Sequence, residues 1–190
     1  MSKTICAYCS SSTAVDAVYI EAARALGVQI ARRGWALIYG GGHMSLMGAL
    51  ARAAQEGGGH VTGVIPAALH RGGHGYRAAD ELLVTGDLRD RKALMESRSD
   101  AFITLPGGFG TLEEALEIIT LKQLGDHNKA IVFLNVNGFF DPLFAMFERL
   151  FAERFAKETF RQLYHIAPDA EGALAYIEAY QPVELERKWF

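Results

Sequence analysis

The sequence lacks the features that mark membrane, secreted and nucleic-acid-binding proteins. No apolar run approaches the roughly 20 residues that span a bilayer, and the first residues lead into a predicted strand rather than a signal peptide. Basic residues form no long run before the C-terminal tail, and the formal net charge is -3. We therefore expect a cytoplasmic protein with no nucleic-acid or membrane partner.

Cysteine and metal-binding motifs are also scarce. The two cysteines, Cys6 and Cys9, have C-x-x-C spacing, but they lie where a predicted strand runs into a loop, whereas a redox C-x-x-C normally opens a helix. No H-E-x-x-H or other metal spacing occurs among the histidines, although His43 follows a glycine loop and could touch a ligand. We expect structural thiols in a reducing compartment and no metal site.

The common nucleotide-binding motifs are missing as well. Two glycine clusters, Gly40–Gly42 and Gly107–Gly110, follow predicted strands, but neither fits the dinucleotide fingerprint G-x-G-x-x-G. The strand after the first cluster ends at Pro66 without an acid for a ribose hydroxyl, and no Walker A or G-x-S-x-G motif occurs. The sequence thus indicates no cofactor. The two loops could wrap one mononucleotide, with a plain tight turn as the alternative for the first.

Apolar segments typical of strands alternate with amphipathic segments typical of helices along all 190 residues. The predicted strands are Thr4–Tyr8, Trp35–Tyr39, His60–Ile65, Glu81–Thr85, Ala101–Leu105, Ala130–Leu134 and Leu163–Ala167. The predicted helices are Asp16–Arg33, His43–Gln55, Asp87–Arg98, Leu112–Leu124, Asp141–Phe155 and Asp169–Ala179, and residues 67–79 are expected to be irregular. This alternation predicts a single α/β domain, 1–190, with a doubly wound parallel sheet, helices on both faces and a ligand at the strands' carboxyl ends.

The most informative stretch is Ser99–Thr120. A buried strand is followed by a glycine-rich loop and then by a helix that opens at Thr111. Free N–H groups and the positive end of the helix dipole suit a phosphate there. Glu113, Glu114 and Glu117 lie just inside the helix, where they either complement the dipole or act chemically beside the anion. Several acids together favour chemistry.

Helical periodicity assigns a face to the residues of two helices. In Asp87–Arg98, Arg91 shares a side with Leu88 and Met95, with Lys92 adjacent. This favours a cation that faces a cleft; an arginine extending past a core edge and an ordinary solvated helix are the alternatives. In the helix after Thr111 the core face is predicted to be Leu112, Ala115, Leu116 and Ile119, with Glu113, Glu117 and Thr120 opposite and Glu114 on the flank.

Several segments resemble the LONELY GUY (LOG) family. PGGFGTLEE (Pro106–Glu114) matches the family signature P-G-G-x-G-T-x-x-E, and GGGHMSLMG (Gly40–Gly48) is similar to G-G-G-x-x-G-L-M-G. YCSSS (Tyr8–Ser12), GVIP (Gly63–Pro66) and DLRDRKALM (Asp87–Met95) match further family segments in the same order. The resemblance covers most of the chain, and its long signature is specific.

The resemblance implies a Rossmann-like fold and hydrolysis of the N-glycosidic bond of a cytokinin riboside 5′-monophosphate, or of AMP, to free base and ribose 5-phosphate. It implies that Arg91 and Glu114 are the catalytic pair. The residues that it implies for substrate binding are Ser11, Gly41, Gly42, Lys92, Met95, Gly108, Phe109, Gly110, Thr111, Leu112, Glu113 and Thr120. Such proteins are often labelled lysine decarboxylases, but Lys122 and Lys129 have no phosphate-binding context for pyridoxal phosphate.

The sequence departs from the family pattern in a few places. Ser45 stands where glycine is usual, Leu88 and Arg89 replace Met and His, and Gly73 stands where plant members have a glutamate that contacts substrate. The alternative function is a non-catalytic carrier of a nucleotide or of molybdenum cofactor, which would not need the arginine–glutamate pair. The resemblance also implies a homodimer or higher homo-oligomer. The phenylalanine-rich helix Asp141–Phe155 could pack as core or as interface, with core favoured.

Overall fold

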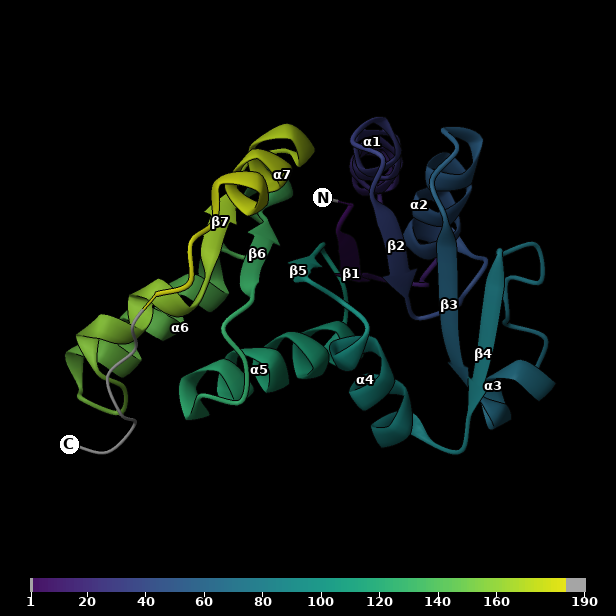
Figure 1. Ribbon diagram of the computed structural model, residues 1–190. Helices are drawn as coiled ribbons and strands as arrows, with labels where there is room; N and C mark the ends of the chain where they lie inside the picture. Colours follow the sequence, from purple (N-terminus) through teal and green to yellow (C-terminus); the bar gives the residue numbers. More distant parts are fainter. Residues whose placement is uncertain (1, 184–190) are drawn as a thin grey trace.

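The computed structural model of the chain describes residues 2–183 and contains a parallel sheet of seven strands (Figure 1). The strands are β1 (Thr4–Tyr8), β2 (Ala36–Tyr39), β3 (Val61–Pro66), β4 (Glu81–Thr85), β5 (Ala101–Thr104), β6 (Ala130–Leu134) and β7 (His165–Ala167). Their order across the sheet is β4-β3-β2-β1-β5-β6-β7, and all neighbours are parallel. The predicted Rossmann-like α/β sheet is confirmed.

The strand order changes direction between β1 and β5. From β1 the chain adds β2, β3 and β4 outward on one side, and it then crosses back to place β5 on the other side of β1. Ala7 of β1 is aligned with both Tyr39 of β2 and Ile103 of β5, so the carboxyl ends of these strands lie at one edge. Open α/β sheets bind ligands in the crevice at such a switch point.

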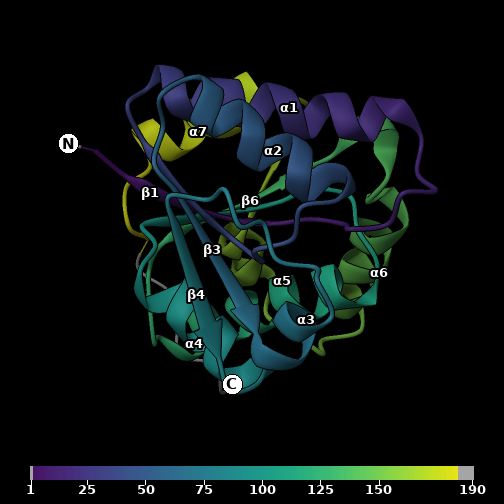
Figure 2. The same ribbon diagram turned by 90° about the vertical axis from the view of Figure 1, so that its right-hand side faces the viewer.

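Helices cover both faces of the sheet, as predicted. They are α1 (Ala17–Arg32), α2 (Ser45–Glu56), α3 (Ala67–Arg71), α4 (Leu88–Ser97), α5 (Phe109–Leu124), α6 (Asp141–Ala152) and α7 (Ala170–Ala179). Figure 2 shows α1, α2 and α7 on one side of the sheet and α3 to α6 on the other. No helix within residues 2–183 is long and apolar enough to cross a membrane.

The face under α1, α2 and α7 is a continuous apolar core. Ile5 and Ile103 of the sheet pack with Leu26 of α1 and Leu50 of α2, and all of these side chains are fully buried. A side chain at Gly27 would collide with the backbone of α2, because the two helices cross closely there. Glycine is therefore required for this crossing.

The opposite face has a smaller apolar cluster and a separate aromatic one. Cys6 and Phe102 of the sheet pack with Met95 of α4 and Ile118 of α5. Next to them, α6 and its flanking turns supply an aromatic cluster. Its buried phenylalanines are Phe140, Phe147, Phe151 and Phe160, while Phe139 and Phe155 are exposed. The phenylalanine-rich helix is thus mainly core, as favoured from the sequence.

Some boundaries differ from the sequence-based prediction. Helix α5 begins at Phe109 rather than Thr111 or Leu112, because the helix starts within the glycine-rich segment despite the weak helix propensity of glycine. Part of the segment expected to be irregular, 67–79, forms α3, and two 3-10 helices, Val136–Gly138 and Glu158–Leu163, were not predicted. Val136 packs in the core under α1, and Phe160 and Leu163 pack with Phe147 and Phe151 of α6. Local sequence does not report such tertiary packing.

Candidate active site

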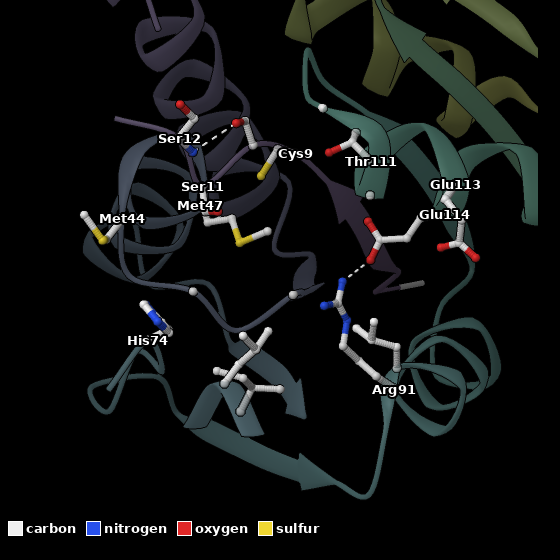
Figure 3. Close-up of a pocket in the computed structure, with 18 of the residues that line it drawn as sticks. Cys9, Ser11, Ser12, Met44, Met47, His74, Arg91, Thr111, Glu113 and Glu114 are labelled. Carbon is white, nitrogen blue, oxygen red and sulfur yellow. Dashed lines mark hydrogen bonds and ion pairs between the residues drawn. The ribbon is translucent and has the colours of Figure 1, made fainter. Parts of the chain in front are cut away.

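A cavity of about 570 Å³ lies at the carboxyl ends of β1, β2 and β5, at the switch point of the sheet (Figure 3). Sites for small molecules typically occupy roughly 300–1,000 Å³. The lining residues are Cys9, Ser10, Ser11, Ser12, Gly40, Gly42, His43, Met44, Met47, Ile65, Leu69, His74, Leu88, Arg91, Lys92, Gly108, Gly110, Thr111, Glu113 and Glu114. The predicted position of the ligand site at the strand ends agrees with this cavity.

A buried ion pair joins α4 to α5 inside the cavity. The guanidinium of Arg91 donates from Nη2 to Oε1 of Glu114, and the residues are only 7% and 5% exposed (Figure 3). Gly40 lies against this guanidinium, since a Cβ at Gly40 would be 3.3 Å from Nη2 of Arg91. Two helices and the end of β2 thus hold the pair in one geometry.

The environment of Glu114 changes its acidity. Burial raises the pKa of Glu114 above its ordinary value, and the charge of Arg91 opposes that rise. The neighbouring Glu113 also raises this pKa, whereas Lys92 lowers it. A buried carboxylate with a raised pKa accepts a proton more readily than an exposed one, and such groups concentrate at catalytic sites.

A second set of ion pairs lies beside the first. Nζ of Lys92 is paired with Glu113 and lies 2.6 Å from Oε2 of Glu117, one turn further along α5. Partial burial lowers the pKa of Lys92, but its hydrogen bonds to Glu113 and Glu117 outweigh burial, and the net direction is upward. Lys92 therefore stays charged, and it ties α4 to α5 next to the Arg91–Glu114 pair.

The N-terminus of α5 forms one wall of the cavity. Gly108 is the N-cap residue, and no side chain within residues 2–183 caps the helix, so its first N–H groups are available to a ligand. Gly107 is packed so closely on Thr111 that a Cβ at Gly107 would overlap the threonine side chain. The glycines therefore let the loop fold onto the start of a helix, which is a suitable site for an anion.

The loop between β2 and α2 forms the facing wall. The hydroxyl of Tyr39 donates to the carbonyl of Gly42 at 3.0 Å, and Gly41 has a φ of 74°. Ser45 also has a positive φ, 49°, and its buried hydroxyl has no hydrogen-bond partner among the described residues. Serine is strained in this conformation, which glycine adopts freely.

The segment after α3 closes the outer rim of the cavity. Gly75 forms an antiparallel bridge with Gly42, and the N–H of Tyr76 donates to the carbonyl of Gly41 at 2.8 Å. The carbonyl of His74 accepts from the backbone N–H of His43 at 3.3 Å, and it lies 3.0 Å from the Nδ1 atom of the same residue. The rim is thus held to the glycine loop mainly through backbone groups.

Comparisons with known proteins show the family of this chain. A family model described as "Possible lysine decarboxylase" matches residues 47–177. The rice protein "Probable cytokinin riboside 5'-monophosphate phosphoribohydrolase LOGL1" is 45% identical over 93% of this chain and 79% of its own length. The Arabidopsis protein "Cytokinin riboside 5'-monophosphate phosphoribohydrolase LOG5" is 39% identical over 95% of this chain and 79% of its own length.

The chain belongs to the LONELY GUY family. Among solved structures, the molybdenum cofactor carrier protein of Chlamydomonas reinhardtii is similar, with a TM-score of 0.71, 25% identity and coverage of 94% of this chain and 97% of that protein. The molybdenum cofactor binding protein of Rippkaea orientalis has a TM-score of 0.72 at 23% identity, with coverage of 94% and 97%. The second likeness concerns the fold alone.

Most of the residues implied by the LONELY GUY resemblance line the cavity. Arg91 and Glu114, implied as the catalytic pair, form its buried ion pair. The residues implied for substrate binding that line it are Ser11, Gly42, Lys92, Gly108, Gly110, Thr111 and Glu113. They come from four different loops and helices, which the fold brings to one edge of the sheet.

Other residues implied for substrate binding lie outside the cavity, which gives that role no structural support. Met95 is in the core, one turn beyond Arg91 and further from the strand ends. Gly41 is packed on β3, and Leu112 contacts the aromatic cluster. Phe109 is 93% exposed, and Thr120 donates its hydroxyl to the carbonyl of Leu116 at 2.8 Å.

The predicted faces of α5 require a correction. Glu114, predicted on the flank, is buried, whereas Leu116, predicted on the core face, is 40% exposed. The buried residues of α5 are Thr111, Glu114, Ala115, Ile118 and Lys122. The error arises because α5 turns Glu114 and Lys122 inward, where Arg91 pairs with Glu114 and the carbonyl of Lys129 accepts a hydrogen bond from Lys122. Periodicity assumes that only apolar residues turn inward.

Several lining residues were not assigned from the sequence. Leu69 and His74 belong to the segment expected to be irregular, and Met44 and Met47 were regarded only as part of a helix. Cys9 was expected to be structural, and it is both buried and part of the lining. The position of all these residues after the end of a parallel strand is the signal that could have identified them.

Proposed function

We propose that the protein hydrolyses the N-glycosidic bond of a purine nucleoside 5′-monophosphate, either a cytokinin riboside 5′-monophosphate or AMP, to free base and ribose 5-phosphate. The observation that supports this most directly is the buried Arg91–Glu114 pair, which lies beside an uncapped helix N-terminus in one cavity. An anion site and a buried carboxylate suit the two ends of a ribose 5-phosphate group. The names of the relatives point to the same reaction.

The binding mode follows from the charges of the cavity walls. The first N–H groups of α5, with Gly108, Gly110 and Thr111, would bind the 5′-phosphate, and the hydroxyl of Ser11 would contact it from the loop after β1. With the phosphate there, the ribose would lie over Glu114, one turn into the helix. The base would occupy the opposite half of the cavity.

Glu114 would act at the anomeric carbon. Cleavage of the C1′–N9 bond sends its electron pair to N9 of the base and leaves positive charge on the ribose ring, which a carboxylate stabilises. A water oxygen then bonds to C1′ and one of its protons goes to Glu114. The departing base takes up a proton from solvent, to which Glu114 later releases its own. Arg91 would hold the carboxylate in place and keep it ionised, because its charge opposes the effect of burial on the pKa.

The test is chromatographic detection of adenine and ribose 5-phosphate after incubation with AMP. Wild type should release both in equal amounts. Glu114→Gln and Arg91→Ala should each slow the release by about 10²–10⁴, while circular dichroism should show an unchanged fold. Wild-type rates in either variant would contradict the assignment of these roles.

The alternative is a carrier that binds a nucleotide or molybdenum cofactor without turnover. The similarity to carrier proteins of the same fold supports it only weakly, at 25% identity or less. A carrier has no need of a buried carboxylate next to its anion site. Binding of AMP by calorimetry with no release of adenine would favour the carrier.

We also propose a cytoplasmic homodimer formed through the outer edge of α5. Phe109 is 93% exposed and Leu116, two turns further, is 40% exposed on the same helix, so this edge presents two open apolar side chains beside the exposed Glu113. A second copy would cover it and shield the cavity. Light scattering should report a dimer that Phe109→Asp dissociates, whereas Phe155→Asp, at a residue 77% exposed elsewhere on the surface, should leave it intact. A monomeric wild type at micromolar concentration would contradict this.

A further inference from the structure

The part of the cavity wall formed by the ends of β2 and β3, the segments after them and Leu88 of α4 carries few polar side chains. Without the β1 loop and the residues of the ion pairs and of the α5 N-terminus, the lining consists of Gly40, Gly42, His43, Met44, Met47, Ile65, Leu69, His74 and Leu88. Among these described residues, nitrogen or oxygen atoms in side chains occur only in the two histidines. A base that lies against this part of the wall has only these two side chains there as hydrogen-bonding partners.

His43 is the more firmly held of the two. Its backbone N–H and its ring Nδ1 both lie against the carbonyl of His74, at 3.3 and 3.0 Å. Its own carbonyl accepts from Nη1 of Arg52 at 3.2 Å. These contacts fix both the backbone and the ring of His43 at the cavity wall.

The contact with His74 also fixes the tautomer of His43. A carbonyl oxygen only accepts hydrogen bonds, so Nδ1 of His43 must be the nitrogen that bears the hydrogen. In the neutral ring, Nε2 is then an acceptor with a free lone pair. Because His74 occupies Nδ1, Nε2 is the ring nitrogen of this cavity-lining residue that remains for a ligand.

We propose that His43 makes the site selective for 6-aminopurines by accepting a hydrogen bond from the N6–H group. This inference rests on the proposed function. Adenine and every 6-aminopurine with a single N6 substituent have at least one hydrogen at N6, and Met44 and Leu69 would contact an apolar substituent there. A 6-oxopurine presents an acceptor at the same position, and two lone pairs would face each other.

The experiment compares kcat/KM for AMP and IMP in wild type and in two substitutions of His43. His43→Asn keeps a side-chain N–H near the position of Nδ1, and so can keep the bond to His74, but it has nothing at Nε2. His43→Gln places its amide oxygen near the position of Nε2. Wild type should prefer AMP, His43→Asn should lose about tenfold to a hundredfold of that preference, and His43→Gln should retain most of it.

Each outcome bears on one of the two proposals. If wild type cleaves AMP and IMP equally, or if His43→Asn keeps the AMP preference, the role of His43 is wrong while the hydrolase remains. Loss of the preference in His43→Gln but not in His43→Asn would show that His43 only fixes the rim. If wild type releases base from neither nucleotide, the proposed function itself fails. Thermal unfolding of each variant shows that the fold is retained.

Discussion

The two faces of the sheet bury very different chemistry. The face under α1, α2 and α7 is closed by apolar side chains such as Leu50. The face under α4 and α5 has a smaller apolar cluster, and to it belong all buried Arg, Lys, Glu and His side chains within residues 2–183: Arg91, Glu114, Lys122 and His127. The sheet thus separates an apolar interior from one that also contains charged and titratable side chains.

This difference assigns different tasks to the two faces. Burying apolar side chains stabilises the folded state by about 25 cal/mol per Å², whereas burying charge costs free energy unless the charge is paired. The first face therefore supplies stability. The second holds Arg91 and Glu114 in a fixed geometry at the carboxyl ends of the strands, which stability alone would not require and chemistry does.

The two substitutions with the largest expected effects should each change one property, stability on the first face and reaction rate on the second. Leu50→Ala removes a fully buried side chain of the apolar face and should lower the free energy of unfolding by about 2–5 kcal/mol, without changing the turnover of the molecules that remain folded. Glu114→Gln should do the reverse, with a large loss of rate and little change in stability. Urea unfolding and AMP hydrolysis on both variants test this. A loss of both properties in both variants would show that the faces are coupled.

Lys122 allows a measurement of how much a buried charge on the second face lowers the free energy of unfolding. Burial lowers its pKa from 10.5 to about 8, and its amine donates to the Lys129 carbonyl and the Tyr180 hydroxyl, each at 2.9 Å. Between these pKa values the unfolded chain binds a proton that the folded chain does not. Wild-type stability should therefore rise with pH through this window, by up to about 1.4 kcal/mol per pH unit.

Methionine at this position cannot titrate. The difference in free energy of unfolding between wild type and Lys122→Met should therefore grow, in favour of wild type, from pH 7 to pH 9. Urea unfolding at the two pH values gives the comparison. A difference that is the same at both values, or that shrinks as the pH rises, would contradict a lowered pKa for this amine.

Ser45 tests backbone strain at the cavity wall. Because its φ is 49° and its hydroxyl is unpaired, Ser45→Gly should raise the free energy of unfolding by about 1 kcal/mol. The matched control is Ser97→Gly in α4, which lacks a positive φ and should instead lower stability by about 0.5–1 kcal/mol. Thermal melts that move in the same direction for both variants would argue against strain at Ser45.

The smallest effect concerns the charges around Glu114. If Glu114 acts as a base, kcat/KM for AMP falls as the pH drops through its raised pKa, because the carboxylate becomes protonated. Glu113→Gln removes a charge that raises this pKa and should move the acid limb of the profile to lower pH. Lys92→Ala removes a charge that lowers it and should move the limb to higher pH. Shifts in the same direction would contradict this arrangement.

The parallel sheet, its helices and the two glycine loops were predictable because each leaves a local signal. Apolar runs of strand length, apolar residues at helical spacing and glycines after strands can each be recognised within a short segment of sequence. The pairing of Arg91 with Glu114 came from family resemblance rather than from spacing, since the residues are far apart in sequence. The burial of Glu114 was missed, because its surroundings are supplied by α4 and β2 rather than by its own helix.

The amino-acid order alone was enough for the fold class, for a cavity at the strand ends and for the glycine-rich loop at the start of α5. Those features depend on propensities and patterns within single segments. Tertiary structure was needed to place Met95, Phe109 and Thr120 outside the cavity and to bring His43 and His74 to its rim. The lining of a site depends on which distant segments meet, and packing of the whole chain decides that.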